Sequence, residues 1–218
     1  MTNQINIANT AILIWFVTPL VWFVRKIVPD RPETEQLVLR PKHLDAILLK
    51  SPELALEGVS MELHRLGNYA LQMVRESLPI LFSGTEEELK SLARMDDNVD
   101  SLHVSIINYL GNLSQENLLP EQSDRLHNYI AIANNIESIG DIVQTNFVES
   151  GMSRLKYDLE MSESTQEVLS SLHEKVCWAI EQSMQALSDD DKKLSRKVSK
   201  AKPEINRLAV QAEIHLEQ

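Results

Sequence analysis

Apolar residues recur at three- and four-residue steps over most of the chain, which is the spacing of an amphipathic α-helix. The clearest example is the stretch from residue 86 to residue 115, where the apolar positions are Leu92, Val99, Leu102, Ile106, Tyr109 and Leu113. The alternation of apolar and polar residues that marks a β-strand is not evident, and neither is a hairpin dipeptide. The pattern therefore predicts an all-α protein.

Helix start and stop signals divide this region into five helices. Residues 51–53 place a Ser N-cap before Pro and Glu, and residues 85–88 offer a capping box. Pro120 can open a third helix, and Ser164 and Ser188 each precede an acidic first turn. We expect an antiparallel bundle of helices over roughly 52–82, 86–115, 121–150, 164–187 and 189–217.

The five predicted helices indicate an internal repeat. A shift of 106 residues aligns residues 99–102 with 205–208 and residues 108–110 with 214–216, although few of the paired residues are identical. The repeat would comprise three helices followed by two. We therefore expect the second three-helix repeat to be incomplete, truncated at its C-terminal end.

The N-terminal region has a different pattern. Residues 5–24 are almost entirely apolar, and twenty helical residues span about 30 Å, the thickness of the hydrocarbon core of a bilayer. Trp15, Trp22 and the pair Arg25–Lys26 are typical of an interfacial anchor. We expect residues 1–28 to be the end of a transmembrane segment, with residues 29–218 on the cytoplasmic side of the cell membrane. A buried core helix and an interfacial helix are the open alternatives.

Composition narrows the possible functions. Residues 29–50 contain three prolines and are expected to be a tether before a helical domain over 51–218. The net charge of −11 argues against a nucleic-acid partner, and the single cysteine, Cys177, excludes disulfides and multi-thiolate metal sites. Because the chain has no readable phosphate loop, nucleophile elbow or Ser/His/Asp grouping, it is not expected to be an enzyme.

Two pairs of carboxylates stand out from the other acidic residues. Asp96 and Asp100 are spaced i, i+4 on the second predicted helix, and Glu137 and Asp141 repeat this spacing on the third. Carboxylates along a core-facing stripe need a proton, an arginine or a metal ion. The four side chains could hold a divalent or ferric ion. On spacing alone, the commoner arrangement is that both pairs face water.

The stretch Asn135-Ile136-Glu137-Ser138-Ile139-Gly140-Asp141 resembles the signature of PhoU-like phosphate-transport regulatory domains, and residues 96–100 resemble the matching acidic motif. More widely, the chain resembles the C-terminal portion of the sodium/phosphate cotransporter family. The resemblance implies two three-helix repeats whose acidic motifs bind metal, with Asp96, Asp100, Glu137 and Asp141 as the first-repeat ligands. Lys202 and Asn206 occupy the corresponding positions of the second repeat, where no metal site is expected.

The resemblance implies a cytoplasmic PhoU-like regulatory portion of a sodium-dependent phosphate transporter, which is not transport-competent alone. Its expected partners are the membrane and the transporter core, together with self-association or a helical partner. The alternative is a stand-alone PhoU-type regulator of phosphate uptake and signalling. A metal-dependent enzyme is a third class, and it is disfavoured because no base or nucleophile constellation is present.

Overall fold

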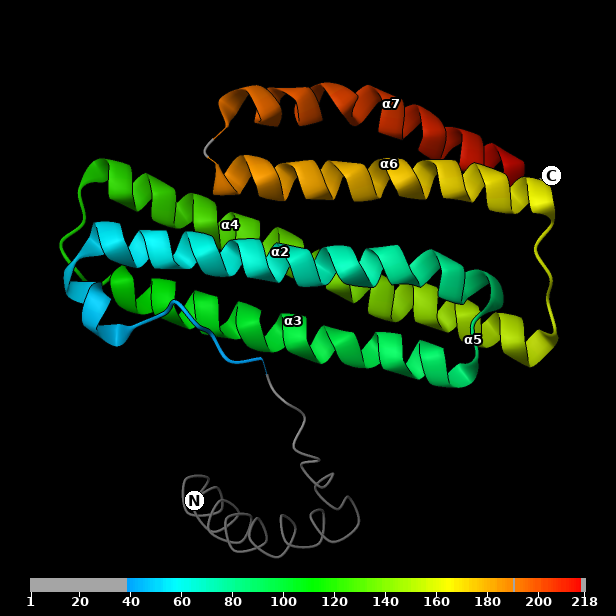
Figure 1. Ribbon diagram of the computed structural model, residues 1–218, viewed down its shortest axis with the longest axis horizontal. Helices are drawn as coiled ribbons and strands as arrows, with labels where there is room; N and C mark the ends of the chain where they lie inside the picture. The colour runs from blue at the N-terminus through cyan, green and yellow to red at the C-terminus, as the bar shows by residue number, and fades with distance from the viewer. Residues whose placement is uncertain (1–38, 190, 217–218) are drawn as a thin grey trace, which may run out of the picture. The chain divides into compact units, whose positions relative to one another are not determined.

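The computed structural model describes residues 39–189 and 191–216, and over these residues the protein is a bundle of long helices (Figure 1). The helices are η1 (Ala46–Lys50, a 3-10 turn), α2 (Pro52–Ser83), α3 (Glu86–Leu113), α4 (Pro120–Ile142), η2 (Val143–Phe147, a π-helical turn), α5 (Val148–Tyr157), α6 (Glu163–Ser188) and α7 (Lys192–Leu216). The described residues contain no strand, so the predicted all-α bundle is confirmed for them. The predicted membrane segment, residues 1–28, lies outside them.

The helix ends follow local capping chemistry. At the start of α3, the Thr85 hydroxyl accepts from the Glu88 N–H at 3.3 Å, and the Glu88 carboxylate accepts from the Thr85 N–H at 2.8 Å. This is the predicted capping box. The last helix begins at Lys192 rather than at 189, because the Asp191 carboxylate caps the N–H groups of Lys193 and Leu194.

The third predicted helix was expected to end near residue 150, and it is longer. Helices α4 and α5 run on through the π-helical turn η2 as far as Tyr157. The chain then turns at Asp158, whose φ of 51° is left-handed, and the Asp158 N–H bonds to the Arg154 carbonyl. The Arg154 guanidinium donates to the Gly84 carbonyl just beyond the C-terminal end of α2. A positive charge at this end of a helix interacts favourably with the helix dipole.

Helix α2 is the central element of the bundle. It packs against α3 and α4, and also against α6 (Figure 1). Its buried residues include Leu56, Leu63, Leu66 and Met73, which belong to one continuous apolar core with residues of α3 and α4. Among the described elements, α7 contacts only α6. The bundle is therefore a three-helix set built on α2, with an α6–α7 layer packed against the same helix.

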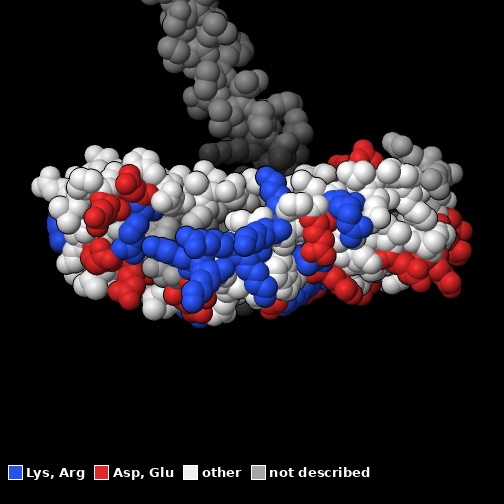
Figure 2. Space-filling model, turned by 90° about the horizontal axis from the view of Figure 1, so that it is seen from above, with Lys and Arg blue, Asp and Glu red and all other residues white. Residues whose placement is uncertain are grey.

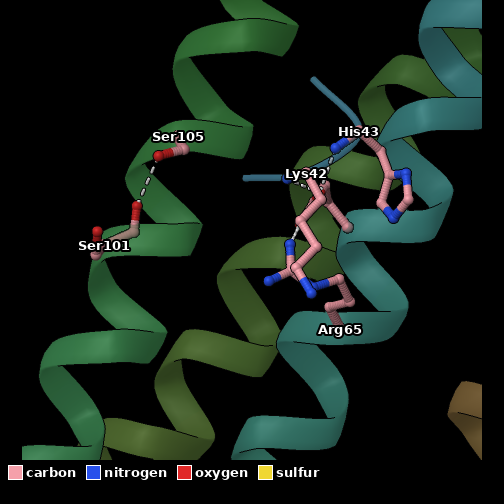
Figure 3. A network of polar contacts seen from close by, with 6 residues as sticks. Lys42, His43, Arg65, Ser101 and Ser105 are labelled. Atoms are coloured by element: carbon pink, nitrogen blue, oxygen red, sulfur yellow. Dashed lines mark hydrogen bonds and ion pairs between the residues drawn. The ribbon is translucent and has the colours of Figure 1, made fainter. Parts of the chain in front are cut away.

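A fully buried carboxylate fixes the segment that leads into the bundle. One oxygen of Glu62 accepts from the backbone N–H groups of Lys42 and His43, at 2.5 and 2.7 Å. The other accepts from the Arg65 guanidinium at 2.5 Å, and Figure 3 shows Lys42, His43 and Arg65 around this point. Gly58 permits the approach, because a Cβ there would lie 2.4 Å from the His43 carbonyl oxygen.

This contact changes the interpretation of the expected tether over 29–50. Residues 39–50 lie on the bundle, since Leu44, Leu48 and Leu49 pack against the core and the Tyr109 hydroxyl donates to the Asp45 carbonyl at 2.8 Å. Of the three prolines in the expected tether, Pro41 lies in the described part of the chain, and Glu62 accepts from the backbone N–H groups of the two residues that follow it. Residues 29–38 lie outside the described part of the chain. None of the described helices is both long enough and apolar enough to cross a membrane.

We predict that Glu62→Gln releases this segment. The amide cannot supply two charged acceptor oxygens to three donors, so the free energy of unfolding should fall by about 2 kcal/mol. Hydrogen exchange at the Lys42 and His43 amides should accelerate. Urea denaturation and exchange mass spectrometry measure both effects, with the exposed Glu57→Gln on the same helix as the control. Equal exchange at these two amides in both variants would contradict the prediction.

Candidate metal centre

Asp96 is a buried carboxylate that the protein leaves unsatisfied. It lies on α3 and is 2% exposed. Among the described residues, the other buried carboxylate is Glu62, which has three donors. The Oδ1 atom of Asp96 has no hydrogen-bond partner in the described structure. A buried acceptor without a donor is costly, so this atom points to a proton or a cation that the site is built to take.

The close approach of α4 creates this burial. Gly140 of α4 lies against Asp96, and a Cβ at that position would be 2.5 Å from the Asp96 Oδ1 atom. Any side chain larger than hydrogen would therefore displace the carboxylate. Ile136 of α4 and Val143, the first residue of η2, are buried one turn to either side of Gly140, and both belong to the core cluster that also contains Val99 of α3. Apolar packing thus holds the two helices together around Asp96.

Two exposed carboxylates complete a cluster with Asp96. Asp100 stands one helical turn further along α3, and Asp141 follows Gly140 on α4. One oxygen from each of Asp96, Asp100 and Asp141 lies within 4.8 Å of the others. Asp96 forms the buried floor of this cluster, while Asp100 and Asp141 open it to solvent. We refer to these three residues as the acidic cluster.

Of the four residues proposed from sequence, the structure brings these three together and places Glu137 beside them. Glu137 is half-buried on α4, and its carboxylate accepts from the neighbouring Ser138 hydroxyl at 3.5 Å. Its oxygen atoms fall outside the 4.8 Å group, but its negative charge acts on both Asp96 and Asp100. In the second repeat, Lys202 and Asn206 are exposed on α7.

The electrostatics of the acidic cluster favour uptake of positive charge. Burial raises the pKa of Asp96 to about 6 from its ordinary value of 3.8, and the charges of Asp100 and Asp141 add to this rise. Burial also raises the pKa of Asp100, followed by repulsion from Asp141 and Glu137, while His103 opposes the shift. None of the ion pairs formed within the described residues includes a member of the cluster, so no lysine or arginine neutralises it.

The donor set fits a hard cation. Three carboxylates supply only oxygen ligands, which suit Mg²⁺, Mn²⁺, Ca²⁺ or Fe³⁺ better than metals that prefer nitrogen and sulfur. The exposed side of the cluster leaves coordination positions for water or for a ligand's oxygen atoms. A cation bound here would supply the Asp96 Oδ1 atom with its missing partner and would offset the repulsion among the carboxylates.

Sequence reasoning missed two features of this site. The first is the role of Gly140, although its place directly before Asp141 was an available signal. The second is the π-helical turn η2, which starts two residues after Asp141. Such turns are often found at functional sites. Here the Thr145 hydroxyl donates to the Asp141 carbonyl at 2.6 Å across the turn, which holds the backbone that carries Asp141.

The part of the chain that carries the acidic cluster matches a known family model. Residues 63–146 match the family model described as the PhoU domain, and this range contains all four acidic residues proposed from sequence. This part of the chain is therefore similar to the PhoU domain.

A distant relationship extends over most of the chain. It is 28% identical over 197 residues to the protein named "Putative inorganic phosphate export protein YjbB" in Escherichia coli strain K12 and to its namesake in Shigella flexneri. It is 27% identical to the namesake in Salmonella typhimurium. Each match covers 90% of this chain and 36% of the relative, so the chain spans about a third of the length of these relatives. No solved structure matches significantly.

We predict that the acidic cluster binds a hard divalent cation such as Mn²⁺. Asp100→Asn/Asp141→Asn removes two ligands, and because even second-shell changes cost about tenfold to a hundredfold in affinity, the loss should be at least about a hundredfold. Glu137→Gln should have a smaller effect, since Glu137 acts through its charge. Mn²⁺ titration followed by electron paramagnetic resonance measures the affinity. The control is Glu121→Gln/Asp124→Asn, two exposed acids at the start of α4. Equal Mn²⁺ binding by the ligand variant and the control would refute the site.

A second prediction follows from the raised pKa of Asp96. The folded, metal-free chain holds this proton more tightly than the unfolded chain, so stability is lost as the pH rises from about 4 to about 6. Relative to Asp96→Asn, the wild-type free energy of unfolding should therefore fall by roughly 2 kcal/mol between pH 4 and pH 7.5.

Urea denaturation of both proteins with a chelator present measures this difference. Excess Mn²⁺ at pH 7.5 should restore the stability of the wild type and leave Asp96→Asn unchanged. Parallel pH profiles for the two proteins would show that Asp96 does not titrate in this range.

Proposed function

We propose that this chain is the PhoU-like regulatory portion of a phosphate transporter, acting on the cytoplasmic side of the membrane. The observation that carries the proposal is the extent of the similarity to the proteins named for inorganic phosphate export. It covers 90% of the chain, whereas the PhoU match covers residues 63–146 alone. We also propose that this transporter depends on sodium, and this part of the proposal rests on the resemblance to sodium/phosphate cotransporters.

The chemistry of the described residues supports a binding role rather than catalysis. Cys177 and His173 form a thiol–imidazole contact at 3.7 Å, but the His173 Nε2 atom is 2.6 Å from the Val74 carbonyl oxygen rather than a carboxylate. Burial also raises the pKa of the Cys177 thiol, which opposes formation of the reactive thiolate. We therefore propose that the chain is not an enzyme and that the acidic cluster acts by binding a cation.

The way in which the cluster could regulate follows from its position between two helices. Asp96 and Asp100 belong to α3, and Asp141 belongs to α4. A cation bound by all three joins the helices, and its loss leaves their carboxylates repelling one another. A regulator needs two states of different free energy, and the occupied and empty cluster would supply them.

Phosphate flux in cells tests the proposal. Cells lacking the coding region for this chain are compared with cells that again carry the wild type, Asp96→Asn/Asp100→Asn/Asp141→Asn, or the control Glu121→Gln/Asp124→Asn. We expect deletion and the triple variant to change the rate of radioactive phosphate efflux or uptake in the same direction, by about fivefold or more. The control should match the wild type. If deletion leaves both phosphate efflux and phosphate uptake unchanged, the chain has no role in phosphate transport and the proposal is wrong.

The alternative, a stand-alone PhoU-type regulator, is separated by two further measurements on the same cells. A carbonate-resistant membrane fraction that contains the chain supports the transporter portion, whereas recovery in the soluble fraction supports the stand-alone regulator. Replacement of Na⁺ by K⁺ in the flux assay tests sodium dependence directly. A flux that responds to the triple variant but not to this replacement would keep the regulatory role and reject the sodium coupling.

A further inference from the structure

Helix α7 carries a concentrated positive charge on an acidic protein. Its first eleven residues, 192–202, contain six basic side chains and no acidic one, although the net charge of the chain is −11. The six are Lys192, Lys193, Arg196, Lys197, Lys200 and Lys202, and all are exposed. Seen from the α7 side of the molecule, basic side chains gather in one band (Figure 2). The ion pairs within the described residues include none of these six. We call residues 192–202 the basic half of α7.

A complementary surface lies at the opposite end of the same layer. Glu163, Glu167 and Glu174, near the start of α6, line a shallow hollow together with Gln166, Ser170 and Ser171. The three glutamates are exposed, and no ion pair within the described residues includes them. We call this surface the glutamate hollow.

The basic half of α7 and the glutamate hollow do not meet within one molecule. Helices α6 and α7 run antiparallel, and Lys175 of α6 pairs with Glu204 of α7 at 2.7 Å near the middle of both (Figure 1). The basic half of α7 therefore lies beside the end of α6, and the glutamate hollow lies near its start.

The outer face of this layer is also unpartnered and partly apolar. Among the described elements, α7 packs on α6 alone. Val210 and Ile214 of α7 remain 51% and 53% exposed. Ile214 lines a second hollow with Val168 and Leu208, adjoining the glutamate hollow along α6. The layer thus combines charges of both signs that form no ion pair within the described residues with exposed aliphatic side chains, a combination that suits a protein interface.

We propose that the α6–α7 layer is the docking surface for a second copy of this chain, arranged antiparallel about a two-fold axis. This arrangement sets the basic half of α7 in each copy against the glutamate hollow of the other. Because the interface is isologous, the complementary contact forms twice. The aliphatic stems of the lysine and arginine side chains would cover Val210 and Ile214 of the partner copy.

The arrangement of positive and negative side chains in the α6–α7 layer favours a second copy of the chain over an anionic lipid surface. A flat anionic membrane would attract the basic half of α7, but it would repel Glu163, Glu167 and Glu174 in the same layer. A nucleic acid would meet the same repulsion. Only a surface that carries both signs in the reverse order satisfies the whole layer, and an antiparallel copy of the layer is such a surface.

Charge-swap variants of the full chain test the proposal, in one non-ionic detergent for all samples. Substitution of Glu for all six basic residues, Lys192, Lys193, Arg196, Lys197, Lys200 and Lys202, reverses the charge of the basic half. Glu163→Lys/Glu167→Lys/Glu174→Lys reverses the charge of the hollow. Sedimentation velocity should show a wild-type dimer whose dissociation constant rises with added salt, because the contacts are exposed ion pairs. Each variant alone should dimerise about tenfold more weakly or worse, since like charges then face each other.

An equal mixture of the two variants should recover the dimer, because both contacts of the mixed pair again join opposite charges. Unfolded variants could not produce this recovery, so it separates the interface from a folding defect. The matched control Glu87→Lys/Asp124→Lys/Glu149→Lys makes the same change in charge as the hollow variant at exposed sites on α3, α4 and α5 and should dimerise as the wild type does.

Three outcomes would overturn the proposal. The first is a monomeric wild type at about 100 μM, a concentration well above the dissociation constant of a specific dimer. The second is failure of the mixed variants to associate. The third is binding of the wild type to phosphatidylglycerol vesicles that the lysine variant loses while its dimerisation is unchanged, which would make an anionic membrane the occupant instead.

Discussion

Burial of carboxylates in an apolar helix bundle is the constraint on which this structure depends. A buried carboxylate costs free energy unless hydrogen-bond donors or a cation balance it. Glu62 and Asp96 are both buried, and the bundle treats them differently. Glu62 receives three donors and fixes the segment before α2. Asp96 has an oxygen with no donor and faces two further carboxylates. The first is a closed structural contact, and the second is a site that is complete only with a proton or a cation.

The central position of α2 links these two carboxylates to the rest of the fold. Glu62 lies on α2, and the apolar residues of the same helix pack against α3, which carries Asp96. Helix α6 packs against α2 as well, so the α6–α7 layer rests on the helix that anchors the N-terminal segment. Residues 39–50, the acidic cluster and the outer layer are thus three features arranged around one helix. A change in the spacing of α3 and α4 acts directly on the core that α2 shares with both.

The sequence predicted what local chemistry determines. Capping residues act within one turn, so the start of α3 at the Thr85–Glu88 capping box was predictable. The acidic cluster could be predicted because i, i+4 pairs on consecutive helices can meet. The burial of Asp96 could not be predicted, since it depends on Gly140 of α4, which is 44 positions away in the sequence. The role of Glu62 was likewise hidden, because two of its three donors are backbone N–H groups, which carry no sequence signature.

Net charge was the least informative property of the sequence, because this chain separates its charges. The value of −11 conceals the basic half of α7, where Lys192, Arg196 and Lys200 follow one another at i, i+4 spacing. Like charges at this spacing repel by a few tenths of a kcal/mol per pair, and cations near a helix N-terminus oppose the dipole. The Asp191 cap offsets part of this cost. Among the described elements α7 packs on α6 alone, so the rest of this cost is not offset there. A facing carboxylate surface would reduce the repulsion and would also give the helix a second packing partner.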